Sequence, residues 1–165
     1  GSCAHPRPRV AASLLVVLVA SVGLGDGQRL KITNGCDQEP IWVAHMAQVT
    51  AGPDEQNLKL RPGASHTFRT PNGLLGTRYW AKMRCDEHGS QCEIGESGGP
   101  EERCNTTLGC APPVDTKFEA SFGADGVDWV DVSLVDGWTL PFVFSTSGRC
   151  ASGDGAPGAG AAREG

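Results

Sequence analysis

The sequence predicts an all-β domain with sandwich architecture. Three observations favour this fold class: short runs in which apolar and polar residues alternate, turn signals between them, and no convincing helical period after the N-terminal apolar stretch. Short strands at close spacing, separated by turn residues, are typical of sandwiches and barrels. At 165 residues the chain has room for one domain.

The expected strands follow in order from residue 29. Residues 29–33 alternate like a half-buried strand and Asn34-Gly35 is a turn signal, so with a strand at 40–45 we expect a hairpin whose connection holds Cys36. Turns at Pro62-Gly63, Pro71-Asn-Gly73 and Asp125-Gly126 separate the later strands, which we expect at 65–69, 76–83, 117–122 and from 129 onward.

The stretch 129–142 is the most informative part of the chain. It reads as an alternating strand, a turn and a second strand, and it carries Asp131 and Asp136 among aromatic and β-branched residues. Acids are poor strand formers, so acids kept inside a strand-like run indicate a functional reason, of which a ligand is one.

Both ends of the chain differ from the domain between them. Residues 1–27 hold Arg7 and Arg9, an apolar run and small residues, which predicts a signal peptide and a secreted protein. A membrane anchor is the weaker alternative, because the apolar run is short of the roughly 20 residues that a spanning helix needs. The chain starts at Gly1 rather than Met, so we expect further residues before it. Residues 151–165 are a Gly/Ala-rich tail for which disorder is expected, which leaves 28–150 as the domain.

Cysteine usage also indicates a secreted protein. Beyond the predicted signal peptide six cysteines remain, an even number that predicts a disulfide framework with 15 conceivable pairings. Four of them border or lie in the Gly/Ser/Glu-rich region 86–113, which we expect to be a disulfide-stapled loop region. No Cys-x2-Cys pair exists and the histidines stand apart, so neither a metal site nor a cofactor is expected.

The net charge of −5 argues against nucleic acid and anionic membranes as partners, since both require basic patches. It fits a neutral or cationic partner such as a polysaccharide.

Several blocks resemble the thaumatin family, which includes the class-five pathogenesis-related proteins of plants. Asp131-Val-Ser-Leu-Val-Asp-Gly-Trp138 resembles the family's Asp-(Ile/Val)-Ser-x-Val-Asp-Gly-(Phe/Trp) block. Further blocks match in the family's order across roughly 30–144. They are Ile32-Thr-Asn-Gly-Cys36 with Pro40-Ile-Trp-Val-Ala44, Leu60-Arg-Pro-Gly-Ala-Ser-His-Thr-Phe68, Arg78-Tyr-Trp-Ala-Lys-Met-Arg-Cys85, Gly89-Ser-Gln-Cys-Glu-Ile-Gly-Glu-Ser-Gly-Gly99, Pro112-Pro113 and Phe118-Glu119. The resemblance implies a thaumatin-like β-sandwich core, in a short or truncated member that lacks the family's second cysteine-rich region and final strand.

The resemblance also implies disulfide pairings. Cys85–Cys92 matches a family pair directly. Ser97 stands where the family has a cysteine, so Cys104 needs a new partner, and Cys110 is the nearest candidate. Cys36 and Cys150 remain as the third and least constrained pair. Asn105-Thr-Thr107 is a glycosylation sequon, although a tight Cys104–Cys110 loop would hinder its modification.

Members of the family often have a cleft lined by one arginine, one glutamate and three aspartates. The resemblance places these on Arg78, Glu119, Asp131 and Asp136, with the third aspartate in the absent region. Carboxylates in a groove can accept hydrogen bonds from sugar hydroxyls, and a carboxyl pair can hydrolyse glycosides if the pKa of one is raised. Alternatively, Arg78 simply pairs with one acid and orders the sheet.

The leading hypothesis is a secreted, monomeric protein with a defence role, which binds β-1,3-glucan or a related cell-wall polysaccharide in this acidic cleft. The first alternative is a weak endo-β-1,3-glucanase, with Glu119 as proton donor and Asp131 as nucleophile or base. The second is an inhibitor of a secreted hydrolase. The indoles of Trp80, Trp129 and Trp138 could stack on sugar rings, although core packing is the more ordinary role for each of them.

Overall fold

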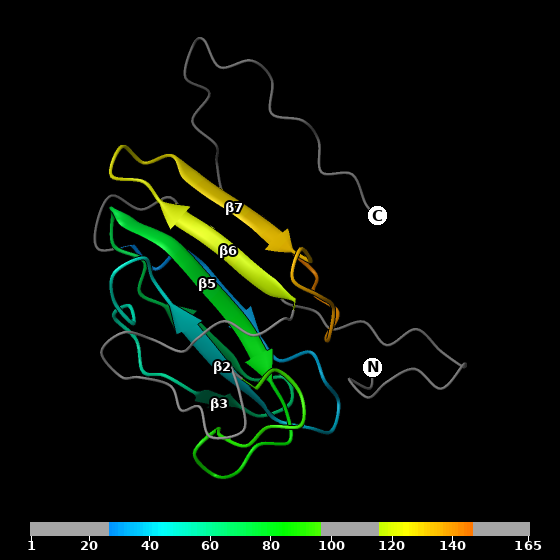
Figure 1. Ribbon diagram of the computed structural model, residues 1–165. Helices are drawn as coiled ribbons and strands as arrows, with labels where there is room; N and C mark the ends of the chain where they lie inside the picture. The colour runs from blue at the N-terminus through cyan, green and yellow to red at the C-terminus, as the bar shows by residue number, and fades with distance from the viewer. Residues whose placement is uncertain (1–26, 97–115, 147–165) are drawn as a thin grey trace.

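The computed structural model describes residues 27–96 and 116–146, and these form two antiparallel sheets (Figure 1). One sheet has the order β1-β4 and the other the order β3-β2-β5-β6-β7. This part of the chain contains no helix, so it holds none that could cross a membrane. The strands are β1 (Leu30–Thr33), β2 (Ile41–Met46), β3 (Leu58–Leu60), β4 (Ser65–Phe68), β5 (Leu74–Lys82), β6 (Lys117–Phe122) and β7 (Asp128–Ser133). The all-β expectation is therefore confirmed.

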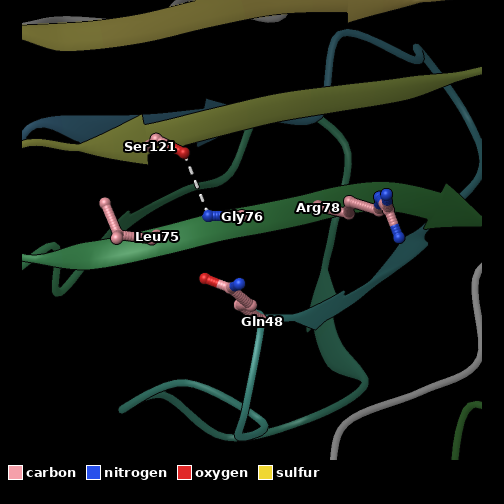
Figure 2. A pocket seen from close by; sticks show the side chains of 5 residues that line it. All are labelled: Gln48, Leu75, Gly76, Arg78 and Ser121. Atoms are coloured by element: carbon pink, nitrogen blue, oxygen red, sulfur yellow. Dashed lines mark hydrogen bonds between the residues drawn. The ribbon is translucent and has the colours of Figure 1, made fainter.

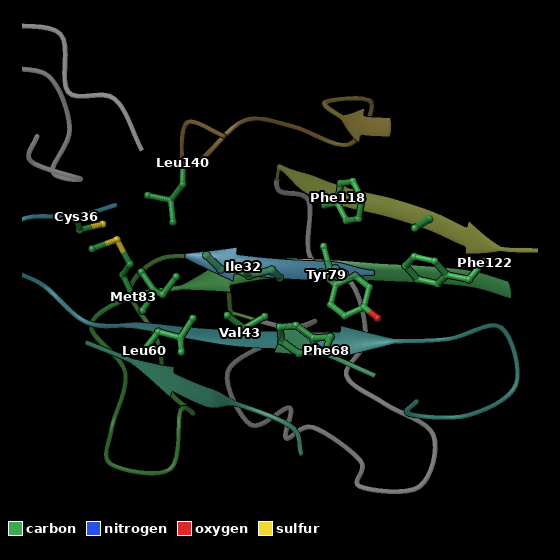
Figure 3. Close-up of a cluster of buried hydrophobic side chains, with 14 residues drawn as sticks. Ile32, Cys36, Val43, Leu60, Phe68, Tyr79, Met83, Phe118, Phe122 and Leu140 are labelled. Carbon is green, nitrogen blue, oxygen red and sulfur yellow. The ribbon is translucent and has the colours of Figure 1, made fainter. Parts of the chain in front are cut away.

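The hydrophobic core lies between the two sheets (Figure 3). Because side chains alternate along a strand, the apolar residues of each strand reach this core on one side. The small sheet contributes Leu30, Ile32 and Phe68, and the rings of Phe68 and Tyr79 meet edge to face at 5.1 Å. The large sheet contributes Ile41, Val43, Leu60, Tyr79, Ala81, Phe118, Ala120 and Phe122. We call this side of the large sheet its inner face and the opposite side its outer face.

The expected hairpin of 29–33 with 40–45 is wrong. β1 pairs with β4, whereas β2 pairs with β3 and β5, so the two strands lie in different sheets. The buried side chain of Asn34 stabilises the segment in which the chain passes from one sheet to the other. Its amide donates hydrogen bonds to the carbonyls of Glu39 and Leu60, at 2.9 and 3.0 Å. The Asn34-Gly35 pair therefore leads the chain from one sheet to the other rather than turning it back.

The second strand expected within 129–142 is also wrong. Residues 134–146 have no strand, and Pro141 lacks the backbone N–H that a ladder requires. The segment is nevertheless packed, because Leu140 is buried in the core and the Thr139 amide donates to the Thr116 hydroxyl at 3.1 Å. Its apolar pattern thus reflects core packing without strand pairing. The short strand β3 was not foreseen.

Arg29 joins the two sheets at one end of the sandwich. Its guanidinium donates to Asp128 at 2.8 Å and to the Thr70 carbonyl at 3.0 Å, and it lies 5.1 Å from the ring centroid of Phe122. Asp128 begins β7 and Thr70 follows β4, so a single side chain ties the last strand of one sheet to the other sheet.

The loop 83–96 covers one end of the outer face. A disulfide joins Cys85 to Cys92, the pair expected from the family. The buried ammonium group of Lys82 donates to the Gly89 carbonyl at 2.5 Å, and burial lowers the pKa of Lys82. A Cβ on Gly89 would lie 2.5 Å from the ring of Trp42, so only glycine fits this close approach.

The other predictions about the disulfide framework concern residues that lie largely outside the described part of the chain. Cys36 is disulfide-bonded, while its expected partner Cys150, the pair Cys104–Cys110 and the sequon at Asn105 lie outside them. The same holds for the predicted tail and for the predicted signal peptide except Gly27.

Candidate functional site

Three of the four predicted site residues form one row across the outer face. Arg78 on β5 is the register partner of Glu119 on β6, and Glu119 is the register partner of Asp131 on β7. Arg78 Nε donates to Glu119 Oε1 at 2.6 Å, in a pair that is partly exposed. Directly opposite residues on antiparallel strands have Cβ atoms about 4.5–5.5 Å apart, so the two carboxylates are immediate neighbours. We call Arg78, Glu119 and Asp131 the carboxylate row.

The two acids of the carboxylate row are in different electrostatic settings. Glu119 forms an ion pair with Arg78, whereas no hydrogen bond or ion pair is found for the carboxyl of Asp131 among the described residues. Partial desolvation and then the charge of Glu119 raise the pKa of Asp131 above its ordinary value of 3.8. Asp131 therefore holds a proton more readily than an ordinary aspartate does.

Asp136 lies beside the row and has a different partner. It follows β7 and accepts a hydrogen bond from Lys117 Nζ at 2.5 Å. This bond, the charge of Lys117 and more weakly that of Arg78 lower the pKa of Asp136. Lys117 precedes Glu119 by two residues on β6, so its side chain leaves the sheet on the same outer face. Asp136 therefore stays ionised and bound to a cation at one side of the row.

Lys117 is a residue that the sequence reading missed. Its side chain is only 2% exposed, which is unusual for lysine. The alternation of 117–122 offered a signal, because Lys117, Glu119 and Ser121 share one face of the strand while Phe118, Ala120 and Phe122 share the other. The ion pair between Asp136 and Lys117 depends on how residues 134–142 fold, so residue spacing alone could not predict it.

An open pocket of about 470 Å³ adjoins the carboxylate row. It is lined by Gln48, Leu75, Gly76, Arg78 and Ser121, so Arg78 belongs to both pocket and row (Figure 2). Figure 2 shows the hydrogen bond from the Gly76 amide to the Ser121 hydroxyl, which is 3.0 Å long. The described lining mixes polar and apolar groups and is uncharged apart from Arg78, which suits a ligand with hydroxyl groups better than a charged one.

The described histidines and acids do not gather into a metal site. No group of three or more His, Cys, Asp or Glu residues within 27–96 and 116–146 could hold a metal ion. His45 instead packs against the rings of Phe68 and Tyr79, and burial lowers its pKa.

The three candidate tryptophans differ sharply in exposure. Trp80 is 1% exposed and serves as a packing residue, whereas Trp129 and Trp138 are 75% and 53% exposed. Core packing, which the sequence favoured for each of them, is therefore wrong for Trp129 and Trp138. A strand at the sheet edge and an irregular loop do not bury them.

Comparison with known proteins finds one family. The Thaumatin family model matches residues 34–159. The chain is 34% identical to "Pathogenesis-related protein 5" of Arabidopsis thaliana, over 74% of this chain and 49% of that protein. It is 31% identical to "Thaumatin-like protein 1" of the same plant, over 74% and 50%, and 31% identical to "Thaumatin-like protein" of Oryza sativa subsp. japonica, over 83% and 73%.

The chain spans about half the length of the two Arabidopsis relatives. The family match nevertheless covers most of the chain and contains both the carboxylate row and the Cys85–Cys92 loop. The chain belongs to the thaumatin family.

Proposed function

We propose that this protein is a secreted, monomeric defence protein that binds a neutral cell-wall polysaccharide of the β-1,3-glucan type through the carboxylate row and its pocket. The observation that carries the proposal is the placement of Arg78, Glu119 and Asp131 on three neighbouring strands beside an open pocket of mixed polar and apolar lining. The name of one relative, "Pathogenesis-related protein 5", supports the defence role.

The chemistry of the row suits sugar hydroxyls. A carboxylate accepts hydrogen bonds from hydroxyl groups, and charge-assisted hydrogen bonds are about twice as strong as neutral ones. Glu119 is held by Arg78, so its remaining lone pairs are presented in a fixed direction. Asp136 is bound to the buried Lys117, so we assign it to support of the site rather than to direct contact with the glycan.

A pull-down on insoluble β-1,3-glucan tests this proposal. The wild type should be retained, while the double variant Glu119→Gln/Asp131→Asn should pass into the unbound fraction. Glu87→Gln is the matched control, because Glu87 is an exposed acid outside the row. Retention of the double variant equal to that of the wild type would contradict binding through the row.

The second candidate function is weak endo-β-1,3-glucanase activity, which the raised pKa of Asp131 favours. Two carboxyl groups on adjacent strands suit glycoside hydrolysis when one carries a proton. The electrostatics favour Asp131 as proton donor and the Arg78-bound Glu119 as nucleophile or base, the reverse of the roles assigned from sequence. Release of reducing ends from a soluble β-1,3-glucan, lost in Asp131→Asn, would establish this activity, and no release by the wild type would exclude it.

A further inference from the structure

A second row of residues runs beside the carboxylate row on the outer face. Trp129 on β7 is the register partner of Ser121 on β6, and the Ser121 hydroxyl accepts the amide hydrogen of Gly76 on β5. Gln48 follows β2 and lines the same pocket as Gly76 and Ser121 (Figure 2). Trp129 and Ser121 are displaced by two residues from Asp131 and Glu119, or about 7 Å along the strands.

The side chains in the middle of this second row are absent or short. Gly76 has no side chain, and Ser121 has a short one. The φ of Gly76 is 58°, at the register shift of β5 between Leu74 and Thr77, and a Cβ added there would lie 3.2 Å from the Cβ of Gln48. The backbone conformation therefore favours glycine at position 76, where a side chain would fill the space between Ser121 and Gln48. We call Trp129, Ser121, Gly76 and Gln48 the trough.

Trp129 stands at one end of the trough as an exposed aromatic surface. Its 75% exposure contrasts with the 1% of Trp80, which belongs to the same sheet and leaves it on the same face. A tryptophan offers a large, rigid apolar surface that loses little conformational entropy when a ligand covers it. Leaving it in water forgoes stability, which a ligand can recover on binding.

The dimensions of the trough suit a short linear chain. Neighbouring strands lie about 4.7–4.9 Å apart, so three intervals from β7 to the segment after β2 give a length of about 14 Å. The Gln48 amide can donate and accept hydrogen bonds at one end. At the other end Asp131, two residues from Trp129 on the same face, offers a carboxylate.

We propose that the trough binds a linear neutral glycan, with one sugar ring stacked on the indole of Trp129 and hydroxyl groups bonded to Asp131 and Gln48. This inference rests on the proposed function and extends it, because it adds an apolar stacking position to the hydrogen-bonding row. A pyranose with equatorial hydroxyl groups presents C–H groups on its faces and hydroxyl groups on its rim. An aromatic platform flanked by polar groups matches both.

Charge favours this occupant over an anionic one. Arg78 is the one cation among the described residues that line the pocket, and it is already paired with Glu119, while the carboxylates beside it would repel an anion. A second copy of the chain is the competing occupant, because β7 is the outermost described strand of its sheet and edge strands can pair with one another. The experiment below separates these two occupants.

Calorimetric titration with a β-1,3-linked glucose hexasaccharide tests the trough. Trp129→Ala should weaken binding about tenfold or more, since an aromatic stacking platform is lost, whereas Trp129→Phe should stay within about threefold of the wild type. Trp138→Ala is the matched control and should bind like the wild type. Trp138 is also exposed, but the neighbouring Thr139 is bonded to Thr116, beyond the opposite end of β6 from Ser121. Tryptophan fluorescence should shift to the blue on titration of wild type and Trp138→Ala, and this shift should be lost in Trp129→Ala.

Three results would overturn the trough. Equal affinity of Trp129→Ala and wild type, with weaker binding by Glu119→Gln/Asp131→Asn, rejects the trough and leaves the proposed function standing. No binding of the hexasaccharide by the wild type rejects the trough, and the pull-down then decides the proposed function. Sedimentation that shows a dimer in the wild type and a monomer in Trp129→Ala, with unchanged affinity for the hexasaccharide, identifies this surface as an interface between copies. Thermal unfolding of each variant checks that its fold is retained.

Discussion

The two faces of the large sheet are made by alternate residues of the same strands, yet they differ in composition and role. On β6, Phe118, Ala120 and Phe122 are buried in the core, while Lys117, Glu119 and Ser121 lie on the outer face with the carboxylate row and the trough. Because the side-chain period of a strand is two residues, one strand supplies core residues to the inner face and site residues to the outer face. Stability and recognition can therefore be changed separately by substitutions at adjacent positions.

The outer face is itself divided into two ends. Around Trp42 and Lys82 it is buried under the loop 83–96, whereas around Glu119 and Asp131 it is open. The covered end resembles a second, smaller core that contains a lysine, and the open end carries the site.

The largest effect should come from the inner face. Phe118→Ala removes a buried ring whose centroid lies 6.3 Å from that of Tyr79, and it should lower the free energy of unfolding by about 3–5 kcal/mol. Urea denaturation measures this loss. Val135→Ala, at an exposed apolar position, should change it by less than about 0.5 kcal/mol. A small loss in Phe118→Ala would mean that the inner face is not the stabilising one.

The covered end of the outer face should be nearly as sensitive to added volume. Gly89→Ala places a methyl group against Trp42 and forces alanine into a backbone with φ of 72°. Gly63 has φ of 73° and open space around it, so Gly63→Ala isolates the backbone cost of about 1–2 kcal/mol. Gly89→Ala should exceed that control by about 1–3 kcal/mol in urea denaturation. Equal losses of unfolding free energy in the two variants would show that the loop 83–96 moves to accommodate the added methyl group.

The two aspartates of the site should affect acid stability in opposite directions. The pKa of Asp136 is lowered by Lys117, so its contribution is present above its unfolded pKa and is lost as pH falls through its folded pKa. The pKa of Asp131 is raised, so its contribution is present at acid pH and is lost as pH rises through its folded pKa. Unfolding free energies from about pH 2 to 6 should therefore fall less on acidification in Asp136→Asn and more in Asp131→Asn than in the wild type. The same pH dependence in both variants would refute the assignment.

The smallest effect concerns the coupling between the two acids of the carboxylate row. Desolvation is the larger cause of the raised pKa of Asp131 and the charge of Glu119 the smaller one. Glu119→Gln should therefore lower the pKa of Asp131 without returning it to its ordinary value. An NMR titration of the Asp131 side-chain carboxyl measures this shift, with Glu87→Gln as the variant that should leave it in place.

Local sequence patterns predicted the positions of the strands better than they predicted which strands pair. The alternation of 117–122 predicted β6 with its bounds, because the period of two is a local property. The hairpin of 29–33 with 40–45 failed, because the sheet that a strand joins depends on the long-range hydrogen bonds of Asn34. The strand expected after Asp136 failed for a related reason, since apolar residues such as Leu140 can fill a core without a ladder.

The site was only partly readable from the sequence. Family motifs brought Arg78, Glu119 and Asp131 together, and the sheet register places them in one row. They could not reveal that Lys117 binds Asp136, because that ion pair depends on how residues 134–142 fold back. The exposure of Trp129 was also unreadable, since an aromatic residue in a strand is usually buried and its position at the sheet edge follows only from topology.

The contact between Arg29 and Asp128 constrains the order of events during synthesis. The two residues are 99 positions apart, and Arg29 also holds the Thr70 carbonyl of the small sheet. Translation proceeds from the N-terminus, and contacts between distant residues form slowly because long loops must close first. A nascent chain that ends before Asp128 can form the small sheet and β2 with β3 and β5, but it lacks both β7 and the acid that fastens the two sheets together. The large sheet is therefore completed late, because β7 can pair with β6 only after Asp128 and the residues that follow it have been synthesised.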